Sequence, residues 1–124
     1  LGQVYYHYRY YELEPAEKMM WLQKELSEFK KAYEINPLDK TVLYGIAMAE
    51  ITTGDLDNGL DHLRRLAKYK QFNDFYWRKL GIELRKAGLY EESLKAFEHA
   101  RQLDRSNRTV RRNIEWLRQK ITVH

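Results

Sequence analysis

The chain of 124 residues contains no cysteine, which excludes disulfide bonds and cysteine-ligated zinc. It has only two prolines and six glycines, so little in the sequence interrupts helices. Its uncharged stretches are too short to cross a bilayer. The sequence also lacks the basic start and apolar run that are typical of a signal peptide. A cysteine-free chain is compatible with a reducing or an oxidising compartment, so the localisation stays unknown.

Apolar and charged side chains are abundant, at 44% and 32% of the residues, as in ordered helical domains. The net charge of +4 is unevenly distributed. Residues 1–100 hold 15 Lys and Arg against 16 Asp and Glu, whereas residues 101–124 hold seven against two. The positive excess therefore lies at the C-terminal end. The sequence begins at Leu1 without a methionine, and we expect a piece of a longer protein.

A period of 34 residues organises the chain. Asp39, Asn73 and Asn107 have this spacing, and each is a short polar residue of the kind that caps a helix start. Gly54 and Gly88 share the period, at positions where a left-handed glycine would end one helix and permit a tight reversal. Each period is therefore predicted to contain two helices.

Apolar residues at helical spacing predict where the helices lie. The expected ranges are residues 15–36, 40–53, 56–70, 74–87, 90–103 and 108–122. Pro15 suits the first turn of the first helix, and Pro37 ends that helix because the residue before a proline disfavours helical geometry. Gly81, inside a helix, costs about 1 kcal/mol relative to Ala, which predicts a close helix crossing there.

Several of these positions carry a family resemblance. They are Phe29, Ala32, Asn36, Pro37, Trp77, Leu80, Gly81, Tyr90, Phe97 and Ala100. Together they resemble the tetratricopeptide repeat (TPR) family, over residues 16–122. The resemblance implies an all-α fold, an α-solenoid of antiparallel helix pairs with a C-terminal capping helix.

The same resemblance divides the chain into five segments. A Tyr-rich segment, 1–14, is the remnant of a partial repeat; 15–37 is the long helix that closes the first unit; 38–73 is a degenerate repeat; 74–107 is a well-matched repeat; and 108–124 is the capping helix. Two alternatives stay open for the Tyr-rich segment. It packs on the long helix, or it lies at a membrane interface, where amphipathic rings are favoured.

In TPR proteins the first helix of each pair lines a concave peptide-binding groove. The residues that this resemblance places there are Tyr44, Met48, Ile51, Phe75, Arg78, Ile82, Arg85, Lys86, Arg112, Trp116 and Lys120. Such an aromatic and cationic surface suits a protein or peptide with acidic side chains or a free carboxylate. The alternative is that the apolar members pack in the core and the arginines are solvated.

Binding of a chaperone's C-terminal tail is not predicted. Met48 and Phe75 stand where the family's clamp for that carboxylate has Asn and Lys. We expect no enzyme activity, no metal and no cofactor. The serines lie in no nucleophile motif, and His62 and His99 lack the one-turn spacing of a zinc pair.

The predicted function is a protein-interaction scaffold that binds through the groove. One alternative is a TPR domain appended to a membrane protein of glycan or envelope assembly. Another is nucleic-acid binding through the C-terminal helix, where Arg111, Arg112 and Arg118 point away from the apolar stripe. A homo-oligomer is also considered, because a short repeat array exposes an apolar end that a second copy could cover.

Overall fold

The structure of the chain is a computed structural model, and it describes residues 14–37 and 39–122. In these residues the secondary structure is entirely helical. The helices are α2 (Pro15–Ile35), α3 (Lys40–Thr53), α4 (Leu56–Tyr69), α5 (Asp74–Lys86), α6 (Tyr90–Leu103) and α7 (Arg108–Thr122). Each of the six predicted helices is confirmed, with ends that agree to within one residue. Residues 1–13 of the Tyr-rich segment lie outside the described residues.

Side-chain caps fix where three helices begin. Asp39, Asn73 and Asn107 each accept a hydrogen bond from a backbone N–H two or three residues further on, at 2.9, 3.0 and 3.1 Å. These bonds satisfy donors that have no partner within the helix, and each cap contributes about 1 kcal/mol. The same N-cap hydrogen bond therefore recurs every 34 residues, together with the residue type that makes it.

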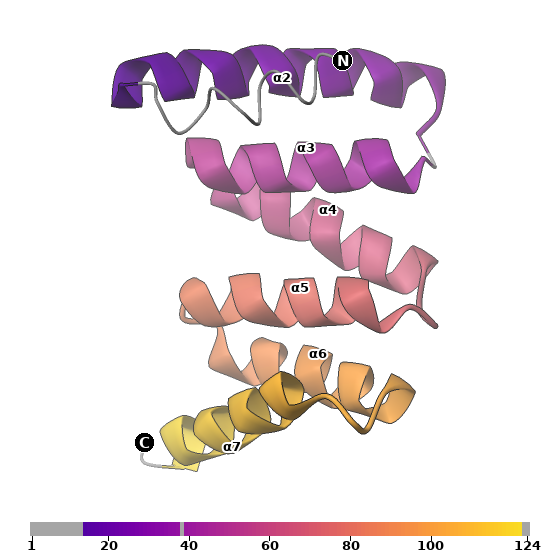
Figure 1. Cartoon of the computed structure of the whole chain (residues 1–124), viewed down its shortest axis with the longest axis vertical. Coiled ribbons are helices and arrows are strands. Elements are labelled where there is room, and N and C mark those ends of the chain that lie inside the picture. The colour runs from indigo at the N-terminus through magenta and orange to yellow at the C-terminus, as the bar shows by residue number, and fades with distance from the viewer. Residues whose placement is uncertain (1–13, 38, 123–124) are drawn as a thin grey trace. The chain divides into compact units, whose positions relative to one another are not determined.

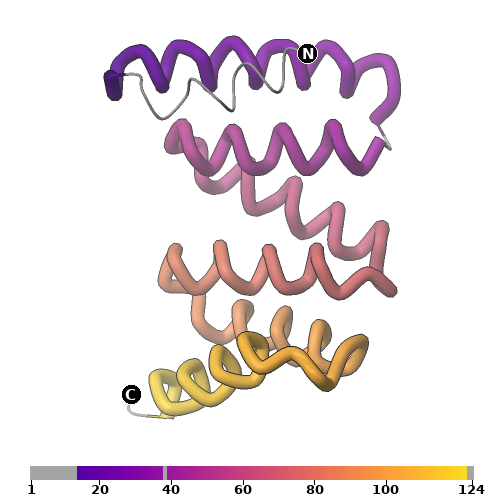
Figure 2. The backbone as a smooth tube through the Cα atoms, viewed as in Figure 1, coloured from indigo at the N-terminus to yellow at the C-terminus, as the bar shows by residue number. Residues whose placement is uncertain are grey.

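Two glycines make the reversals within the predicted repeats. Gly54 and Gly88 have φ angles of 99° and 81°, in the left-handed region where a side chain would be strained. Gly54 caps α3, and Gly88 lies in the short turn between α5 and α6. The tube in Figure 2 shows how tightly the chain reverses between these two helices. The predicted role of both glycines is confirmed.

The chain forms two compact units, Leu1–Gly59 and Leu60–His124. In the first unit α2 packs against α3, and the two lie side by side in Figure 1. Gly45 of α3 permits the close approach, because a Cβ there would lie 2.6 Å from the ring of Phe29 in α2. The buried residues of α3 are Leu43, Ile46, Ala47, Ala49 and Glu50, whereas no residue of α2 is fully buried.

In the second unit α6 packs between α5 and α7. Its core cluster consists of Phe97, Ala100, Val110, Ile114 and Leu117, all at most 1% exposed. Val110, Ile114 and Leu117 recur at helical spacing, so one stripe of α7 covers α6. This is the apolar stripe that the sequence indicates for the last helix.

Gly81 marks the crossing of α5 with α6. A Cβ at this position would lie 2.8 Å from the ring of Phe97, closer than packed atoms tolerate. Beside it, the buried Ser93 hydroxyl donates a hydrogen bond to the Gly81 carbonyl oxygen at 2.7 Å. The close crossing predicted from a glycine inside a helix is therefore confirmed.

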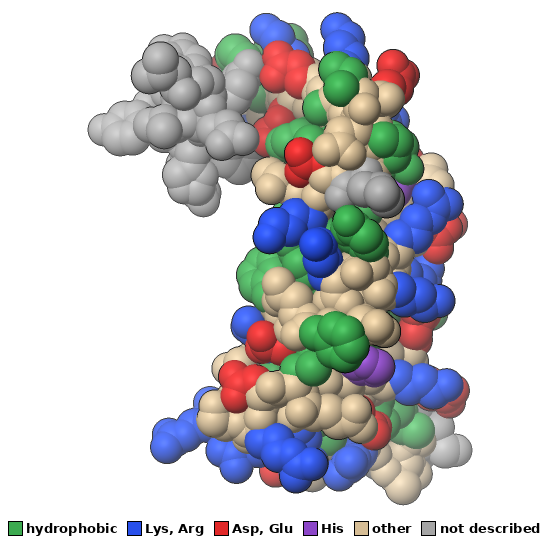
Figure 3. Space-filling view, turned by 90° about the vertical axis from the view of Figure 1, so that its right-hand side faces the viewer, with side chains coloured by type: hydrophobic (Ala, Val, Ile, Leu, Met, Phe, Trp, Pro, Cys, Tyr) green, Lys and Arg blue, Asp and Glu red, His purple; other side chains and the backbone are tan. Residues whose placement is uncertain are grey.

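These contacts join helices that are neighbours in sequence, which is the organisation of an all-α helical solenoid. Lys and Arg side chains gather at the end of the second unit where α6 and α7 lie (Figure 3). None of the helices in residues 14–122 is both long and apolar enough to span a membrane.

Candidate ligand-binding surface on α5 and α7

Three side chains of the second unit lie against the indole ring of Trp116, and a fourth is hydrogen-bonded to one of them. We call this group the Trp116 cluster: Arg85 from α5, Tyr90 from α6, and Asn113, Trp116 and Lys120 from α7. The Arg85 guanidinium carbon lies 3.8 Å from the centre of the Trp116 ring, and the Lys120 ammonium lies 5.3 Å from it. The Tyr90 ring meets the indole edge-on at 5.5 Å. Both cations lie within the range of a cation–π interaction.

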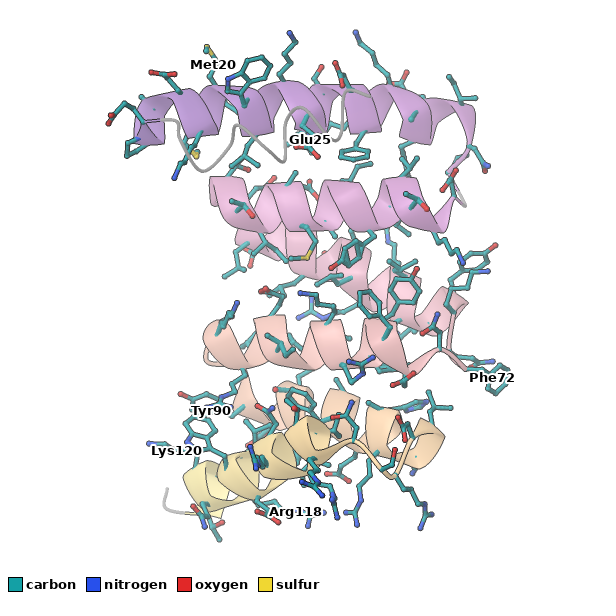
Figure 4. The ribbon with its side chains drawn as sticks, in the orientation of Figure 1. Met20, Glu25, Phe72, Tyr90, Arg118 and Lys120 are labelled. Atoms are coloured by element: carbon teal, nitrogen blue, oxygen red, sulfur yellow. The ribbon has the colours of Figure 1, made fainter. Side chains whose placement is uncertain are left out.

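The helix geometry explains how α7 presents its part of the cluster. Asn113, Trp116 and Lys120 follow one another at intervals of three and four residues, so they share one face of α7. Trp116 also packs against the core cluster, which holds its ring in place. In Figure 4, Tyr90 and Lys120 lie close together at the C-terminal end of α7. The face is therefore built on packed helices and not on a loop.

The cluster carries positive charge that carboxylates of the described residues do not neutralise. Arg85 donates a hydrogen bond to the side-chain oxygen of Asn113, which is a neutral acceptor. A guanidinium has five N–H donors, so Arg85 keeps donors for a ligand. Lys120 forms no ion pair with any residue in the described part of the chain. Both cations therefore lie beside the indole and are available to an acidic group.

An open pocket borders the cluster. It has a volume of about 640 Å³. Its walls are Gly88, Leu89, Tyr90, Glu91, Glu92, Lys95 and Ile121. Tyr90 therefore belongs to both the pocket and the cluster. The carboxylate of Glu92, another wall residue, is bound by Arg64, whose hydrogen bonds lower the pKa of Glu92.

Other residues that the sequence places on this surface lie elsewhere along α5. Phe75 and Arg78 form a second cation–aromatic pair at the start of the helix, at 5.7 Å, and Arg78 is also paired with Asp74 at 3.0 Å. Lys86 lies 3.6 Å from Glu83 at the other end. These two cations already have carboxylate partners, whereas Arg85 has none within residues 14–37 and 39–122.

Solved structures include a similar protein, the TPR domain of Arabidopsis OM64. The two align with a TM-score of 0.68 over 85% of this chain and 87% of that one, at 19% sequence identity. The chain has the fold of a TPR domain. No family model and no curated protein sequence matches it.

The remaining residues that the sequence predicts for the site are divided between the second unit and the first. Ile82 of α5 packs against the core cluster, and Arg112 is exposed on α7. Tyr44, Met48 and Ile51 belong to α3 in the first unit and are half-buried. Ile51 packs close to Gly59, where a Cβ would lie 2.6 Å from its Cγ1 atom.

Sequence reasoning missed two members of the Trp116 cluster, Tyr90 and Asn113. The sequence separation between bonded residues could have identified Asn113. Arg85 and Asn113 are 28 residues apart, and so are Arg64 and Glu92, a second pair of hydrogen-bonded side chains in this unit. In these two pairs, side chains of equivalent helices therefore meet at an offset six residues shorter than the period of 34. A search for complementary side chains at that offset finds both pairs.

His99 lies at an exposed position of α6. Its ring stacks on Trp77 with the centroids 4.1 Å apart. In the described residues, 14–37 and 39–122, no group of three or more histidine or acidic side chains has the arrangement of a metal site.

Proposed function

We propose that this TPR domain is a protein-interaction scaffold that binds an acidic peptide on the face formed by α5 and α7. The observation that carries the proposal is the Trp116 cluster, in which Arg85 and Lys120 lie beside an indole and no carboxylate of the described residues pairs with them. TPR folds are quasi-one-dimensional stacks that present extended binding surfaces. A surface of tryptophan, tyrosine and arginine has the composition of an interface hot spot.

The chemistry of the cluster suits a carboxylate beside an apolar side chain. A carboxylate between Arg85 and Lys120 would accept charge-assisted hydrogen bonds, which are stronger than those between neutral groups. The apolar side chain would enter the neighbouring pocket along Tyr90. The two cations select for an acidic residue, and the pocket selects for the side chain next to it.

A peptide array with systematically placed Asp, Glu and free C-terminal carboxylates would identify a probe. Calorimetry would then measure the affinity of the full chain for that peptide. We expect Arg85→Gln to weaken binding about tenfold, because a charge-assisted hydrogen bond is lost. Lys120→Gln should weaken it about threefold, as for an exposed ion pair.

Arg108→Gln is the matched control. It removes the same charge from the same helix, about 18 Å along the axis from Lys120. Its affinity should stay within about twofold of the unmodified chain, because screening weakens charges beyond a Debye length. Equal losses in Arg85→Gln and Arg108→Gln would mean that net charge, and not this surface, binds the peptide.

A further inference from the structure

A second concave feature of the second unit is lined by arginines. We call it the arginine pocket. Its volume is about 180 Å³, and its walls are Glu98, Arg101, Gln102, Arg105 and Arg118. Glu98, Arg101, Gln102 and Arg105 recur at intervals of three, four and seven residues, so one face of α6 and the turn beyond it supply four of the five. Arg118 reaches the pocket from α7.

Packing in the core brings the arginines of the two helices together. Leu117, the neighbour of Arg118, is fully buried in the seam between α6 and α7. Ala100, the neighbour of Arg101, lies in the same core cluster. Arg101 and Arg118 therefore each follow a buried core residue, and this packing holds the backbone in place on both sides of the pocket.

The charge of the pocket is strongly unbalanced. Three guanidinium groups face one carboxylate, and 3 − 1 leaves a charge of +2. In the described part of the chain, Arg101, Arg105 and Arg118 take part in no ion pair. Guanidinium groups repel one another, and an anion between them would offset that repulsion. Arginine binds phosphate oxygens through pairs of parallel hydrogen bonds.

We propose that the arginine pocket binds one phosphate group, carried by a phosphorylated segment of a partner protein. A phosphate monoester offers three acceptor oxygens and close to two negative charges. That matches three arginines and a pocket charge of +2, whereas a single carboxylate would satisfy one arginine. Gln102 adds a neutral amide donor to the same wall.

This pocket is separate from the Trp116 cluster. Arg118 follows Trp116 by two residues, which places it about 200° further around α7. In Figure 4, Arg118 and Lys120 lie on opposite sides of the α7 ribbon. The proposal therefore does not depend on the peptide-binding function, and one site can fail without the other.

The distribution of charge on α7 favours a single phosphate over a nucleic acid. Arg111 and Arg118 share one side of the helix, whereas Arg108 and Arg112 occupy another and Lys120 a third. A nucleic acid needs a continuous basic track, and single strands add aromatic platforms on which bases stack. Here Arg85 covers a face of the Trp116 ring, and Glu98 interrupts the basic wall.

The first experiment is an NMR titration of the full chain with inorganic phosphate. We expect chemical-shift changes centred on residues 98–105 and 118, and binding that strengthens as the pH rises through the neutral range, where inorganic phosphate gains its second negative charge. Arg101→Gln and Arg118→Gln should each weaken binding about threefold to fivefold. Glu98→Gln should tighten it, because it removes the negative charge from the wall.

Arg65→Gln is the matched control, since it removes one exposed arginine of α4 that does not line the pocket. Its phosphate affinity should be unchanged. Equal weakening by Arg65→Gln and Arg118→Gln, or shifts spread evenly over all basic residues, would overturn the site. So would a Glu98→Gln chain with weaker binding than the original.

The second experiment identifies the source of the phosphate. The probes are a short peptide with one phosphoserine, the same peptide without phosphate, and a DNA oligonucleotide. Binding that requires the phosphate and is reduced by Arg118→Gln supports the proposal. Tighter binding of the oligonucleotide, with an affinity that falls steeply between about 50 and 200 mM salt, would replace it with nucleic-acid recognition.

Discussion

Phe29 of α2 and Phe97 of α6 lie 68 residues apart, two full periods, yet their surroundings differ. Each ring meets a glycine of a neighbouring helix: Phe29 meets Gly45 in the helix that follows, and Phe97 meets Gly81 in the helix that precedes. Phe97 is also covered by α7 and is 1% exposed, whereas Phe29 is half-buried. The repeat preserves the residue type, but neighbouring helices decide its contribution to stability.

A second pair of equivalent positions shows the same principle with a polar group. In the second unit the Ser93 hydroxyl donates to the Gly81 carbonyl. One period earlier the positions are Gly59 and Ala47, and a Cβ on Gly59 would lie 2.9 Å from the Ala47 carbonyl oxygen. Both solutions bring a small residue against a backbone oxygen. In the degenerate repeat, Gly59 lets the two helices approach closely. In the well-matched repeat, the Ser93 hydroxyl donates a hydrogen bond to the backbone oxygen.

The largest expected effect comes from truncating the two phenylalanines. Phe97→Ala should lower the free energy of unfolding by about 3–4 kcal/mol, because it leaves a cavity in the core cluster. Phe29→Ala should cost about half as much, since its ring is half-buried. Urea unfolding followed by circular dichroism measures both. If Phe97→Ala does not fold, Phe97→Leu should still cost about 1 kcal/mol. Equal losses at the two sites would show that the packing of α7 on Phe97 adds nothing to the free energy of unfolding.

The two crossing glycines should respond differently to the same substitution. Gly81→Ala should destabilise the chain by about 1–2 kcal/mol, because the fully buried Phe97 ring has no room to move. Gly45→Ala should be close to neutral. The half-buried Phe29 ring can shift, and alanine improves helix propensity by about 1 kcal/mol. Thermal unfolding of both variants, compared at one pH, provides the test. A Gly45→Ala loss as large as that of Gly81→Ala would contradict the comparison.

The Ser93 hydrogen bond should be worth a smaller amount. Ser93→Ala should lower stability by about 1 kcal/mol, the usual net value of a buried hydrogen bond. Ser27→Ala, at an exposed position of α2, is the matched control and should change stability by less than about 0.5 kcal/mol. Denaturant unfolding resolves the difference. If both variants behave alike, the hydroxyl has only a packing role.

The smallest expected effect depends on pH and involves the bridge between α4 and α6. Arg64 donates from Nε and Nη2 to the two oxygens of Glu92, at 2.5 and 2.8 Å, and these bonds lower the pKa of Glu92. A lowered folded-state pKa contributes stability above the unfolded value of about 4.3, and that stability is lost as pH falls through the folded value. Because both side chains are partly exposed, the contribution at pH 7 should be at most about 1 kcal/mol.

Unfolding of the original chain and of Glu92→Gln, measured from neutral to strongly acidic pH, tests this bridge. The difference in stability should be present near pH 7 and vanish in acid. Lys30 and Asn58 occupy the positions one period earlier, so Lys30→Gln is the control and should show no such pH dependence. A Glu92→Gln deficit that persists in acid would rule out the charged pair as its cause.

The helices could be predicted from the sequence because their boundaries depend on local chemistry. Asp39, Asn73 and Asn107 mark starts, and Gly54 and Gly88 mark reversals, each through bonds or φ angles within a few residues. The close crossing at Gly81 was also predictable, because a helical glycine has few other uses.

The candidate surface was predictable only in part. Arg85, Trp116 and Lys120 follow from their positions in the repeat, and the structure brings them together. Asn113 and Tyr90 do not follow, because their contacts depend on how far α5, α6 and α7 are displaced along one another. The arginine pocket has the same origin, since the packing of α7 places Arg118 at the same pocket as Arg101 and Arg105.

The short turn at Gly88 has a consequence for how fast the second unit folds. Because α5, α6 and α7 each pack on the helix next in sequence, every closure that forms this core involves a short loop. The entropy lost on closing such loops is small, and helical proteins of low contact order fold in about microseconds to milliseconds. A helical hairpin of α5 and α6 is then a natural nucleus, with α7 adding to its exposed side.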